Sequence, residues 1–269
     1  MDPEIVERTR RSFQAATEHM PTVIDKIRYR RKPIDLRGCY RTLAGDHRAV
    51  GIYDYFIDRN LRSFKQNLYV ASQLELAAIA LDAYQTFEVG REIFYALFSD
   101  NTEIISVMAH METPELLKDR DNPLRLRFHV HMWQLSILGD YEALQTKVDK
   151  LARNGRKGER ELAAVGKDFF SLLMRGDKQG LEDLINQHAS LKSADPLIEN
   201  FMSFQGCLEA KVSWLRGIPV QIDSPLVPME LMPVGPLDHY DDVYDFLNPG
   251  WEPLQEGLLT RVSMWMRNR

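Results

Sequence analysis

The chain has 269 residues, of which 44% are hydrophobic and 27% charged, a composition typical of globular proteins that excludes the disordered and collagen-like classes. Its net charge of −5 argues against a general nucleic-acid-binding surface, which would be strongly basic. Only two cysteines are present, Cys39 and Cys207, far apart in sequence, and that count fits a reducing compartment with both thiols packed and not bridged.

The N-terminal stretch MDPEIVERTRRSF is acidic and then basic, and it has no apolar run of signal-peptide length. Nowhere do eighteen apolar residues follow one another, as a membrane-spanning helix would require. We therefore expect a cytoplasmic protein without a targeting segment and without contact to a membrane.

Residues 1 to about 25 are predicted to form an amphipathic helix, since apolar side chains fall on one side and charged ones on the others. The apolar side consists of Ile5, Phe13, Ala16 and Met20. Pro21 is expected to interrupt this helix and restart the chain, because proline lacks the backbone donor.

The stretch from Lys26 to Arg48 is the most basic part of the chain, and Asp35 and Asp46 are its only acidic residues. Two interpretations stay open. The stretch is either a site for phosphate or for an acidic partner, or a solvated face whose arginines pair with the acidic C-terminal run. The basic residues are Lys26, Arg28, Arg30, Arg31, Lys32, Arg37, Arg41 and Arg48.

Residues 52 to 111 are predicted to be helical, because apolar residues recur there at three- and four-residue steps and LELAAIALDAY is rich in strong helix formers. The recurring residues are Ile52, Phe56, Leu61, Phe64, Leu68, Ala71, Leu74 and Ala78. No useful strand-type alternation interrupts them, so the chain is expected to be nearly all-α.

A weak internal repeat predicts the architecture of the middle of the chain. VGREIF at 89–94 lines up with VGKDFF at 165–170, and the turns at Gly139-Asp140 and Gly176-Asp177 are separated by 37 residues. Each turn has a glycine to end one helix and an aspartate to cap the next, and Ser99-Asp100-Asn101 takes the same place without the glycine. Three stacked antiparallel hairpins of about 37 residues are therefore expected between residues 76 and 191.

A fourth unit is predicted to begin with a helix from Phe201 to Arg216 that ends at Gly217. Its second half is replaced by a segment that cannot be helical, because each proline removes a donor and favours an extended residue before it. After a turn at Asn248-Pro249-Gly250, a final helix is expected to close the core. The prolines are Pro219, Pro225, Pro228, Pro233 and Pro236, and the final helix carries Leu254, Leu258, Val262 and Trp265 on one side.

These elements predict an all-α fold of stacked antiparallel helical hairpins, an array like those of helical-repeat proteins, with a proline-rich extended C-terminal segment. The chain is expected to be a single helical domain, 1–269. Its parts are N-terminal helices with the basic stretch (1–75), hairpin units (76–217), and the proline-rich segment with the acidic run and closing helix (218–269).

The acidic run DHYDDVYDF is the candidate partner-binding site. Tyrosine supplies contact area at little conformational cost, and carboxylates complement a basic groove on another protein. An amphipathic helix, with Tyr240, Val243, Tyr244 and Leu247 inward and the aspartates in water, is the alternative, and both interpretations can hold together. The candidate residues are Asp238, Tyr240, Asp241, Asp242, Tyr244 and Asp245.

Residues suited to catalysis are few. His129 and His131 are two apart, which on a helix points them about 200° from each other, so they cannot share a metal as an i, i+4 pair could. The basic turn at 155–158 lacks the spacing of a phosphate loop, and Cys207 lies in an apolar helix, which favours packing over reactivity. We expect no enzyme, no cofactor and no metal site.

The end of the array, LEAKVSWLRGIPVQIDSPLVPMELMPVGPL, resembles the C-terminal signature of bacterial immunity proteins that neutralise polymorphic toxins, in particular the immunity protein 49 family. In that family a helix ending in RGIPV leads into a D-x-P-x-x-P-x-x-L segment. The matching positions here are Leu208, Ala210, Leu215, Arg216, Gly217, Ile218, Pro219, Val220, Asp223, Pro225, Pro228 and Leu231.

The resemblance implies a mostly helical cytoplasmic protein of a toxin-producing bacterium, which binds a cognate toxin and blocks its active site. Such toxins are secreted effectors used in bacterial competition, including those of type VI secretion, and a nuclease with a basic cleft would suit the acidic run. The family supplies no catalytic residues, and its toxin-contacting positions vary with the partner.

Two other classes stay open. A helical-repeat adaptor would bind a peptide or protein in the concave face of the stacked hairpins. A nucleic-acid binder would work through Lys26 to Arg48, whereas the immunity interpretation expects no direct nucleic acid. A homodimer is a further alternative, because surplus apolar surface on helical arrays often pairs.

Overall fold

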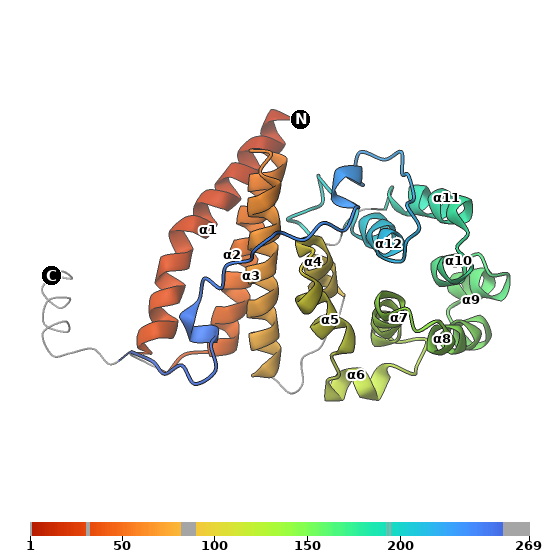
Figure 1. Ribbon diagram of the computed structural model, residues 1–269, viewed down its shortest axis with the longest axis horizontal. Coiled ribbons are helices and arrows are strands. Elements are labelled where there is room, and N and C mark those ends of the chain that lie inside the picture. Colours follow the sequence, from red (N-terminus) through yellow and green to blue (C-terminus); the bar gives the residue numbers. More distant parts are fainter. Residues whose placement is uncertain (1, 31–32, 82–89, 192, 194, 255–269) are drawn as a thin grey trace, which may run out of the picture.

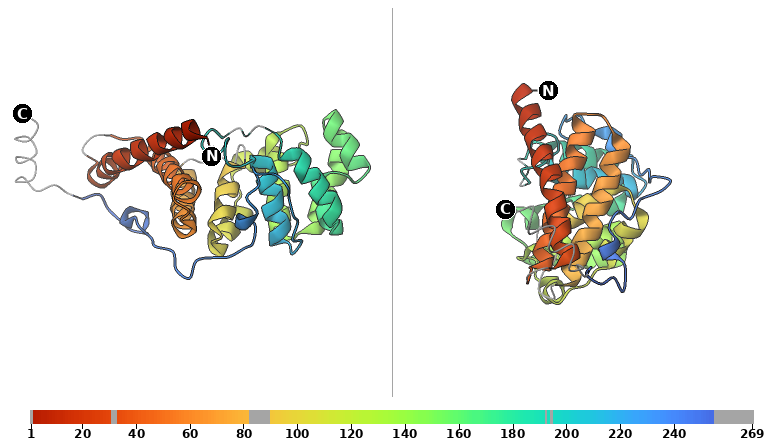
Figure 2. Two further views of the ribbon diagram at one scale, coloured as in Figure 1. Left: turned by 90° about the horizontal axis from the view of Figure 1, so that it is seen from above. Right: turned by 90° about the vertical axis from the view of Figure 1, so that its left-hand side faces the viewer.

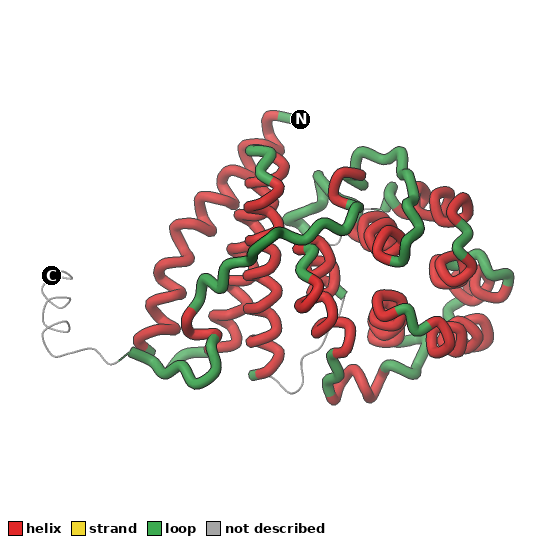
Figure 3. Tube along the Cα trace, viewed as in Figure 1, coloured by secondary structure: helices red, strands yellow, loops and turns green. Residues whose placement is uncertain are grey.

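The computed structural model describes residues 2–30, 33–81, 90–191, 193 and 195–254, and this part of the chain contains helices and loops but no strand (Figure 3). The all-α prediction is therefore confirmed. The helices are α1 (Pro3–Tyr29), α2 (Leu36–Phe56), α3 (Leu61–Ala80), α4 (Arg91–Ser99), α5 (Thr102–His110), α6 (Pro114–Asp119), α7 (Leu126–Leu138), α8 (Tyr141–Asn154), α9 (Lys157–Ala164), α10 (Phe169–Arg175), α11 (Lys178–His188) and α12 (Phe204–Leu215), with short 3₁₀ helices η1 (Met229–Leu231) and η2 (Asp245–Leu247).

The first three helices are long and pack against one another at one end of the molecule (Figure 1). Each begins at a side chain that accepts a hydrogen bond from a free backbone N–H of the first turn, which stabilises a helix by about 1 kcal/mol. The capping residues are Asp2, Asp35 and Asn60.

α1 continues through Pro21, so the predicted interruption there is wrong. Pro21 and Thr17, whose carbonyl would pair with the missing N–H, are both exposed, and water can satisfy that carbonyl. Beyond the proline, Val23 and Ile27 are buried in a cluster with residues of α2 and α3. This packing holds the last turns of the helix.

Three antiparallel hairpins follow, α4–α5, α7–α8 and α10–α11, as the repeat predicts. Gly139 ends α7 in the left-handed conformation (φ 74°), and Asp140 caps α8. Gly176 (φ 65°) and Asp177 do the same between α10 and α11. Glycine suits both turns because it adopts positive φ at little cost.

The first hairpin departs from this pattern. Asp100 ends α4 in the left-handed conformation (φ 58°) where the other hairpins have glycine, and Asn101 caps α5. This unit begins near Gly90 and not at residue 76, because α3 continues to Ala80. A left-handed residue other than glycine costs about 1 kcal/mol or more, so Asp100 requires a compensating interaction.

The connections between hairpins differ from the expectation. The short helices α6 and α9 follow the first and second hairpins and were not predicted. α12 begins at Phe204 and not at Phe201, because the hydroxyl of Ser203 accepts a hydrogen bond from the N–H of Gly206 at 3.2 Å and so caps the helix there.

Residues 218–254, the C-terminal strap, contain η1, η2 and a few turns and are otherwise extended. Figures 1 and 2 show the strap leaving α12, crossing α3 and ending beside α1, where the N–H of Leu254 donates to the carbonyl of Arg28 at 2.8 Å. The predicted turn at 248–250 is present, with the N–H of Trp251 donating to the carbonyl of Asn248. The predicted closing helix lies, apart from Leu254, outside the described residues.

Two hydrophobic clusters form the core. The larger one fills the hairpin array and includes residues of α2 and α3, where Phe56 stacks on Phe201 with 4.6 Å between ring centroids. The smaller one lies among α1, α2 and α3 and includes Tyr244 and Phe246 of the strap. The strap therefore contributes to the core at the end of the molecule opposite to the hairpins.

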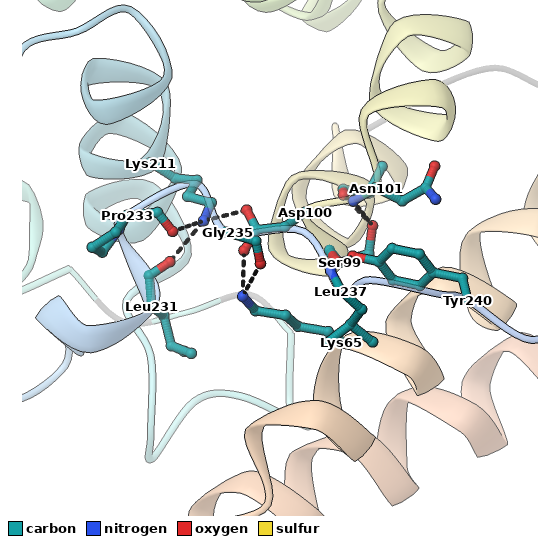
Figure 4. A network of polar contacts seen from close by, with 11 residues as sticks. Lys65, Ser99, Asp100, Asn101, Lys211, Leu231, Pro233, Gly235, Leu237 and Tyr240 are labelled. Carbon is teal, nitrogen blue, oxygen red and sulfur yellow. Dashed lines mark hydrogen bonds and ion pairs between the residues drawn. The ribbon is translucent and has the colours of Figure 1, made fainter.

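The strap is fixed near its centre by two buried lysines that share one buried aspartate (Figure 4). Nζ of Lys211 lies 2.6 Å from Oδ1 of Asp100, and Nζ of Lys65 lies 2.9 Å from Oδ2. The exposed fractions are 1% for Lys211 and Asp100 and 7% for Lys65. Asp100 thus compensates its left-handed backbone with two ion pairs.

The lysines also bind the backbone of the strap. Lys211 donates to the carbonyls of Leu231 (2.7 Å) and Pro233 (3.2 Å), and Lys65 donates to that of Gly235. Leu231 ends η1, and Pro233 and Gly235 lie in the extended segment that follows it, so these carbonyls need partners of this kind when they are buried. Burial lowers the pKa of Lys211, and Asp100 opposes that shift.

Arg216, at the end of α12, packs on the turn of the second hairpin. Its guanidinium carbon lies 5.6 Å from the centre of the Tyr141 ring, and a Cβ on Gly139 would lie only 2.3 Å from a guanidinium nitrogen. Glycine is therefore needed at position 139 for two reasons: the backbone has a positive φ, and the side chain of Arg216 at the end of α12 approaches too closely for a Cβ.

We expect Lys211→Met to lower the free energy of unfolding by about 3 to 5 kcal/mol, because it removes one partner of a buried pair and leaves strap carbonyls unpaired. Urea denaturation measures the change. Lys178→Met is the matched control, since Lys178 is exposed and its pair with Glu182 (3.7 Å) contributes about 0.5 kcal/mol or less. Similar losses for both variants would contradict a structural role of the buried network.

We expect Gly139→Ala to lose more stability than Gly176→Ala. Both positions have positive φ, which costs alanine about 1 kcal/mol or more. Only Gly139 also faces a neighbouring side chain, whereas a Cβ on Gly176 meets nothing within 4 Å. If both variants lose the same free energy of unfolding in urea denaturation, the contact with Arg216 does not contribute to the difference and the prediction is wrong.

Candidate functional site

Residues 238–244 of the acidic run are extended and residues 245–247 form η2, so the run is not one amphipathic helix, although Tyr244 and Leu247 pack against the core as that interpretation placed them. Its backbone pairs with a side chain of α3 and not with itself. Gln66 accepts from the N–H of Asp241 at 3.0 Å and donates to the carbonyl of Asp241 at 2.9 Å. This amide occupies the place that a neighbouring strand would take in a sheet.

Both tyrosines of the run point into the molecule. The hydroxyl of Tyr240 donates to the carbonyl of Ser99 at 2.6 Å, beside the buried aspartate (Figure 4). Tyr244 is buried, and its hydroxyl lies 2.8 Å from Nε2 of His47. Burial raises the pKa of Tyr244 to about 12. These two residues, predicted to contact a partner, anchor the strap to the helices.

Two of the predicted aspartates are engaged within the chain. Asp242 accepts hydrogen bonds from Tyr69 (2.6 Å) and Gln73 (2.7 Å), which hold the pKa of this carboxyl below its usual value. Asp245 forms an ion pair with Arg28 at 2.9 Å. Both carboxylates nevertheless belong to exposed residues, and these contacts fix their positions.

The other two predicted aspartates face the solvent. Asp241 pairs only loosely with His239, at 3.2 Å between two largely exposed side chains. The carboxylate of Asp238 makes no ion pair or hydrogen bond within the described chain. The strap thus presents four exposed carboxylates around two inward-pointing tyrosines. We call these carboxylates the acidic strip: Asp238, Asp241, Asp242 and Asp245.

The basic stretch from Lys26 to Arg48 is divided between two environments. Arg28 pairs with Asp245 of the strap, which confirms for this arginine the expected pairing with the acidic run. Arg48 is buried and pairs with Glu75 of α3 inside the core. Outside Arg31 and Lys32, which the structure does not describe, the basic residues of the stretch are therefore divided between the surface and the core.

A second candidate site is an open groove of about 550 Å³ among α7, α8, α9, α10, α11 and α12, which we call the hairpin groove. Its floor is aromatic, with Trp133 packed against Phe169 and Phe170 at 5.0 and 4.9 Å between ring centroids. Four leucines line the groove, and 41% to 54% of the surface of each is exposed to solvent. These are Leu124, Leu126, Leu162 and Leu191.

A histidine held by a buried glutamate lines the groove between α11 and α12. Glu209 is 1% exposed and accepts from Nδ1 of His188 at 2.8 Å and from Gln205 at 2.7 Å. The hydrogen bond to Glu209 raises the pKa of His188, while burial raises the pKa of Glu209 and His188 opposes that shift. When Glu209 is ionised it only accepts, so Nδ1 is the donor, and Nε2 has no hydrogen-bond partner among the described residues.

The other carboxylates of the groove are also engaged. Glu159 of α9 lies 3.2 Å from Nε2 of His129 on α7. Asp168 caps α10 by accepting from the N–H groups of Phe170 and Ser171, each at 3.1 Å. Asp168 and Oε1 of Glu159 are thus engaged by groups of this chain, whereas the buried Oε2 of Glu159 has no hydrogen-bond partner among the described residues.

Two arginines of the groove lack an acidic partner. Arg156 donates to the carbonyl of Leu124 at 3.4 Å, and Arg125 makes no ion pair or hydrogen bond within the part of the chain that the structure describes. These two unneutralised arginines, beside carboxylates that are mostly engaged, give the groove a preference for an apolar ligand that carries a negative group.

The sequence did not identify the groove residues as a site. The repeat predicted hairpins with a concave face, but the groove takes side chains from several helices that meet only in the folded chain. One local signal was available. Leu124 and Leu191 lie just outside the ends of helices, where apolar side chains are not needed for a helix face.

His129, His131 and Cys207, considered in the sequence as metal ligands or reactive groups, have defined surroundings. His129 lines the groove, whereas His131, two residues on, lies close to Lys147 and Arg120. The described residues include no group of three or more side chains that could hold a metal ion. Cys207 is packed, as predicted, with Sγ donating to a backbone carbonyl at 3.1 Å, and burial raises the pKa of its thiol.

Comparisons of the chain with protein-family models, curated proteins and solved structures gave no match. No helix of the described ranges is long and apolar enough to cross a membrane. The functional argument therefore depends on the acidic strip and the hairpin groove themselves.

His131 predicts a pH dependence of stability. Burial, helped by the nearby cations Lys147 and Arg120, lowers the pKa of His131 to about 4. As the pH falls from 6.5 to 4, the unfolded chain binds a proton that the folded chain does not, so stability falls. Because the side chain is only half-buried, we expect this loss in the free energy of unfolding to be about 1 to 2 kcal/mol.

The test compares the free energy of unfolding of the wild type and of His131→Gln between pH 7 and pH 4. The variant should lose less stability over this range than the wild type. His239→Gln is the control, since His239 is 74% exposed and should leave the slope unchanged. Parallel slopes for His131→Gln and the wild type would contradict the prediction.

Proposed function

We propose that this protein is an immunity protein that binds a cognate bacterial toxin and occludes the toxin's active site with the acidic strip. The observation that carries this proposal is the anchoring of the strip. Tyr240 and Tyr244 fix the strip to the helices by hydrogen bonds to Ser99 and His47, so that the carboxylates of Asp238 and Asp241 face outward in a fixed arrangement.

Fixed geometry favours tight binding. An extended segment that was free in solution would lose conformational entropy on binding, whereas the strap is already held by the helices. A row of carboxylates complements the basic cleft of an enzyme that acts on nucleic acid, and such complementarity accelerates association and selects the partner. A nuclease is therefore the toxin that best fits the strip.

The residues of the resembling motif have structural roles, which is consistent with a family whose toxin contacts vary. Gly217 has φ 78°, and Val220 is fully buried, with its carbonyl accepting from Trp214. The N–H of Asp223 donates to Asn186 of α11 at 3.0 Å. The motif thus builds the passage from α12 to the strap, while the acidic strip lies beyond it.

The test is a binding assay between the purified chain and the product of the reading frame adjacent to its gene. We expect a one-to-one complex whose affinity falls with added salt, and loss of toxicity when both proteins are made together. The double variant Asp238→Lys/Asp241→Lys should bind at least about tenfold more weakly at low salt.

Asp149→Lys is the matched control, because Asp149 is an exposed aspartate on α8, remote from the strap. It should bind as the wild type does. Unfolding free energies of both variants should match the wild type, since the substituted side chains are exposed. Unchanged affinity and salt dependence for the double variant would refute the strip as the contact, and failure to bind the adjacent gene product would refute the immunity proposal.

A further inference from the structure

The hairpin groove is a second surface with the features of a binding site, and it is separate from the acidic strip. The strip lies on the strap across α3, whereas the groove lies among α7 to α12 at the other end of the molecule (Figure 1). We propose that the hairpin groove binds an extended or helical segment of a partner protein that carries a bulky apolar side chain next to an acidic residue.

The bulky apolar side chain of the proposed partner segment, its anchor, is inferred from the shape of the groove. The floor of Trp133, Phe169 and Phe170 is buried yet borders an open volume of about 550 Å³, which is large enough for one or more bulky side chains. Aromatic-lined pockets of this kind hold the residues that dominate protein-protein affinity.

The leucine rim favours a peptide over a small molecule. Leu124, Leu126, Leu162 and Leu191 are exposed by 53%, 52%, 41% and 54%. A compact ligand on the floor would leave these side chains in water. A chain that passes over the floor would cover them, as the residues around an interface anchor exclude water from it.

The acidic residue of the proposed partner segment is inferred from the charged groups that line the groove. Asp168 and Glu209 are engaged by groups of this chain, and Glu159 pairs with His129 through Oε1 while its Oε2 has no partner among the described residues. The guanidinium groups of Arg125 and Arg156 have no carboxylate partner among the described residues, and Nε2 of His188 becomes a further donor when the imidazole is protonated. A carboxylate on the ligand would satisfy these donors, whereas a lysine would be repelled.

Charge also argues against residues 255–269 of this chain, or of a second copy, as the occupant. That segment contains three arginines, Arg261, Arg267 and Arg269, and only one acidic side chain, Glu256. The strap moreover ends beside α1, at the end of the molecule far from the groove (Figure 1).

The probes are short fluorescein-labelled peptides with Phe and Leu anchors flanked by glutamate, and matched peptides flanked by lysine. We expect saturable binding of the glutamate series by fluorescence polarisation, with a change in Trp133 emission that Trp133→Phe removes. The lysine series should bind at least about tenfold more weakly.

Leu126→Asp and Leu191→Asp should each weaken binding of the glutamate peptides at least about tenfold without unfolding the protein, because both leucines are exposed. Val107→Asp is the matched control, since Val107 is 45% exposed on α5 and lies outside the groove. Arg125→Glu/Arg156→Glu should reverse the preference from glutamate to lysine peptides.

Three outcomes would overturn the proposal. Equal binding of both peptide series, unaffected by the leucine variants, would show non-specific association. Saturation by dodecanoate without binding of any peptide would assign the groove to a small amphipathic ligand. A dimer seen in light scattering and abolished by Leu191→Asp would assign it to a second copy. The acidic-strip variants should leave peptide binding unchanged, so failure here is distinguishable from failure of the toxin proposal.

Discussion

The ion pairs of Asp100 with Lys65 and Lys211 are the interaction on which the arrangement of the molecule depends. Asp100 belongs to the first hairpin, Lys65 to the N-terminal helices and Lys211 to α12, so one carboxylate joins three parts of the chain. Both lysines also bind carbonyls of the strap, which has no ladder of its own. Buried charges of this kind are costly unless every partner is present, and the network therefore favours one position of the strap.

The position of the strap determines what each of its residues can do. Tyr240 lies beside the network and Tyr244 lies farther along against His47, so the tyrosines point inward and the intervening carboxylates point outward. An acidic surface on a rigid support can bind a basic partner without first being ordered. The hairpin groove, at the other end, offers the opposite chemistry, with an apolar floor and unneutralised arginines.

Much of the helical scaffold could be predicted from local sequence. The turns at Gly139-Asp140 and Gly176-Asp177 identified two hairpins because a left-handed glycine and a capping aspartate act within a few residues. The predicted interruption of α1 at Pro21 was wrong, because one missing hydrogen-bond donor at an exposed position costs little compared with the packing energy of the helix. The helical alternative failed for residues 238–244 because Gln66 of α3 satisfies the extended backbone at Asp241.

The sequence by itself determined the all-α class, the hairpin turns and the extended character of the proline-rich segment, since these depend on propensity, capping and missing donors within short stretches. It also showed that Asp100 breaks the glycine pattern of the turns, but not why. Only the tertiary structure decided that Asp100 binds two lysines, that Tyr240 and Tyr244 face the core, and that a groove forms among α7 to α12. The reason is that these contacts join residues separated by 35 to 197 positions or collected from several helices, and such pairs are selected by packing of the whole chain.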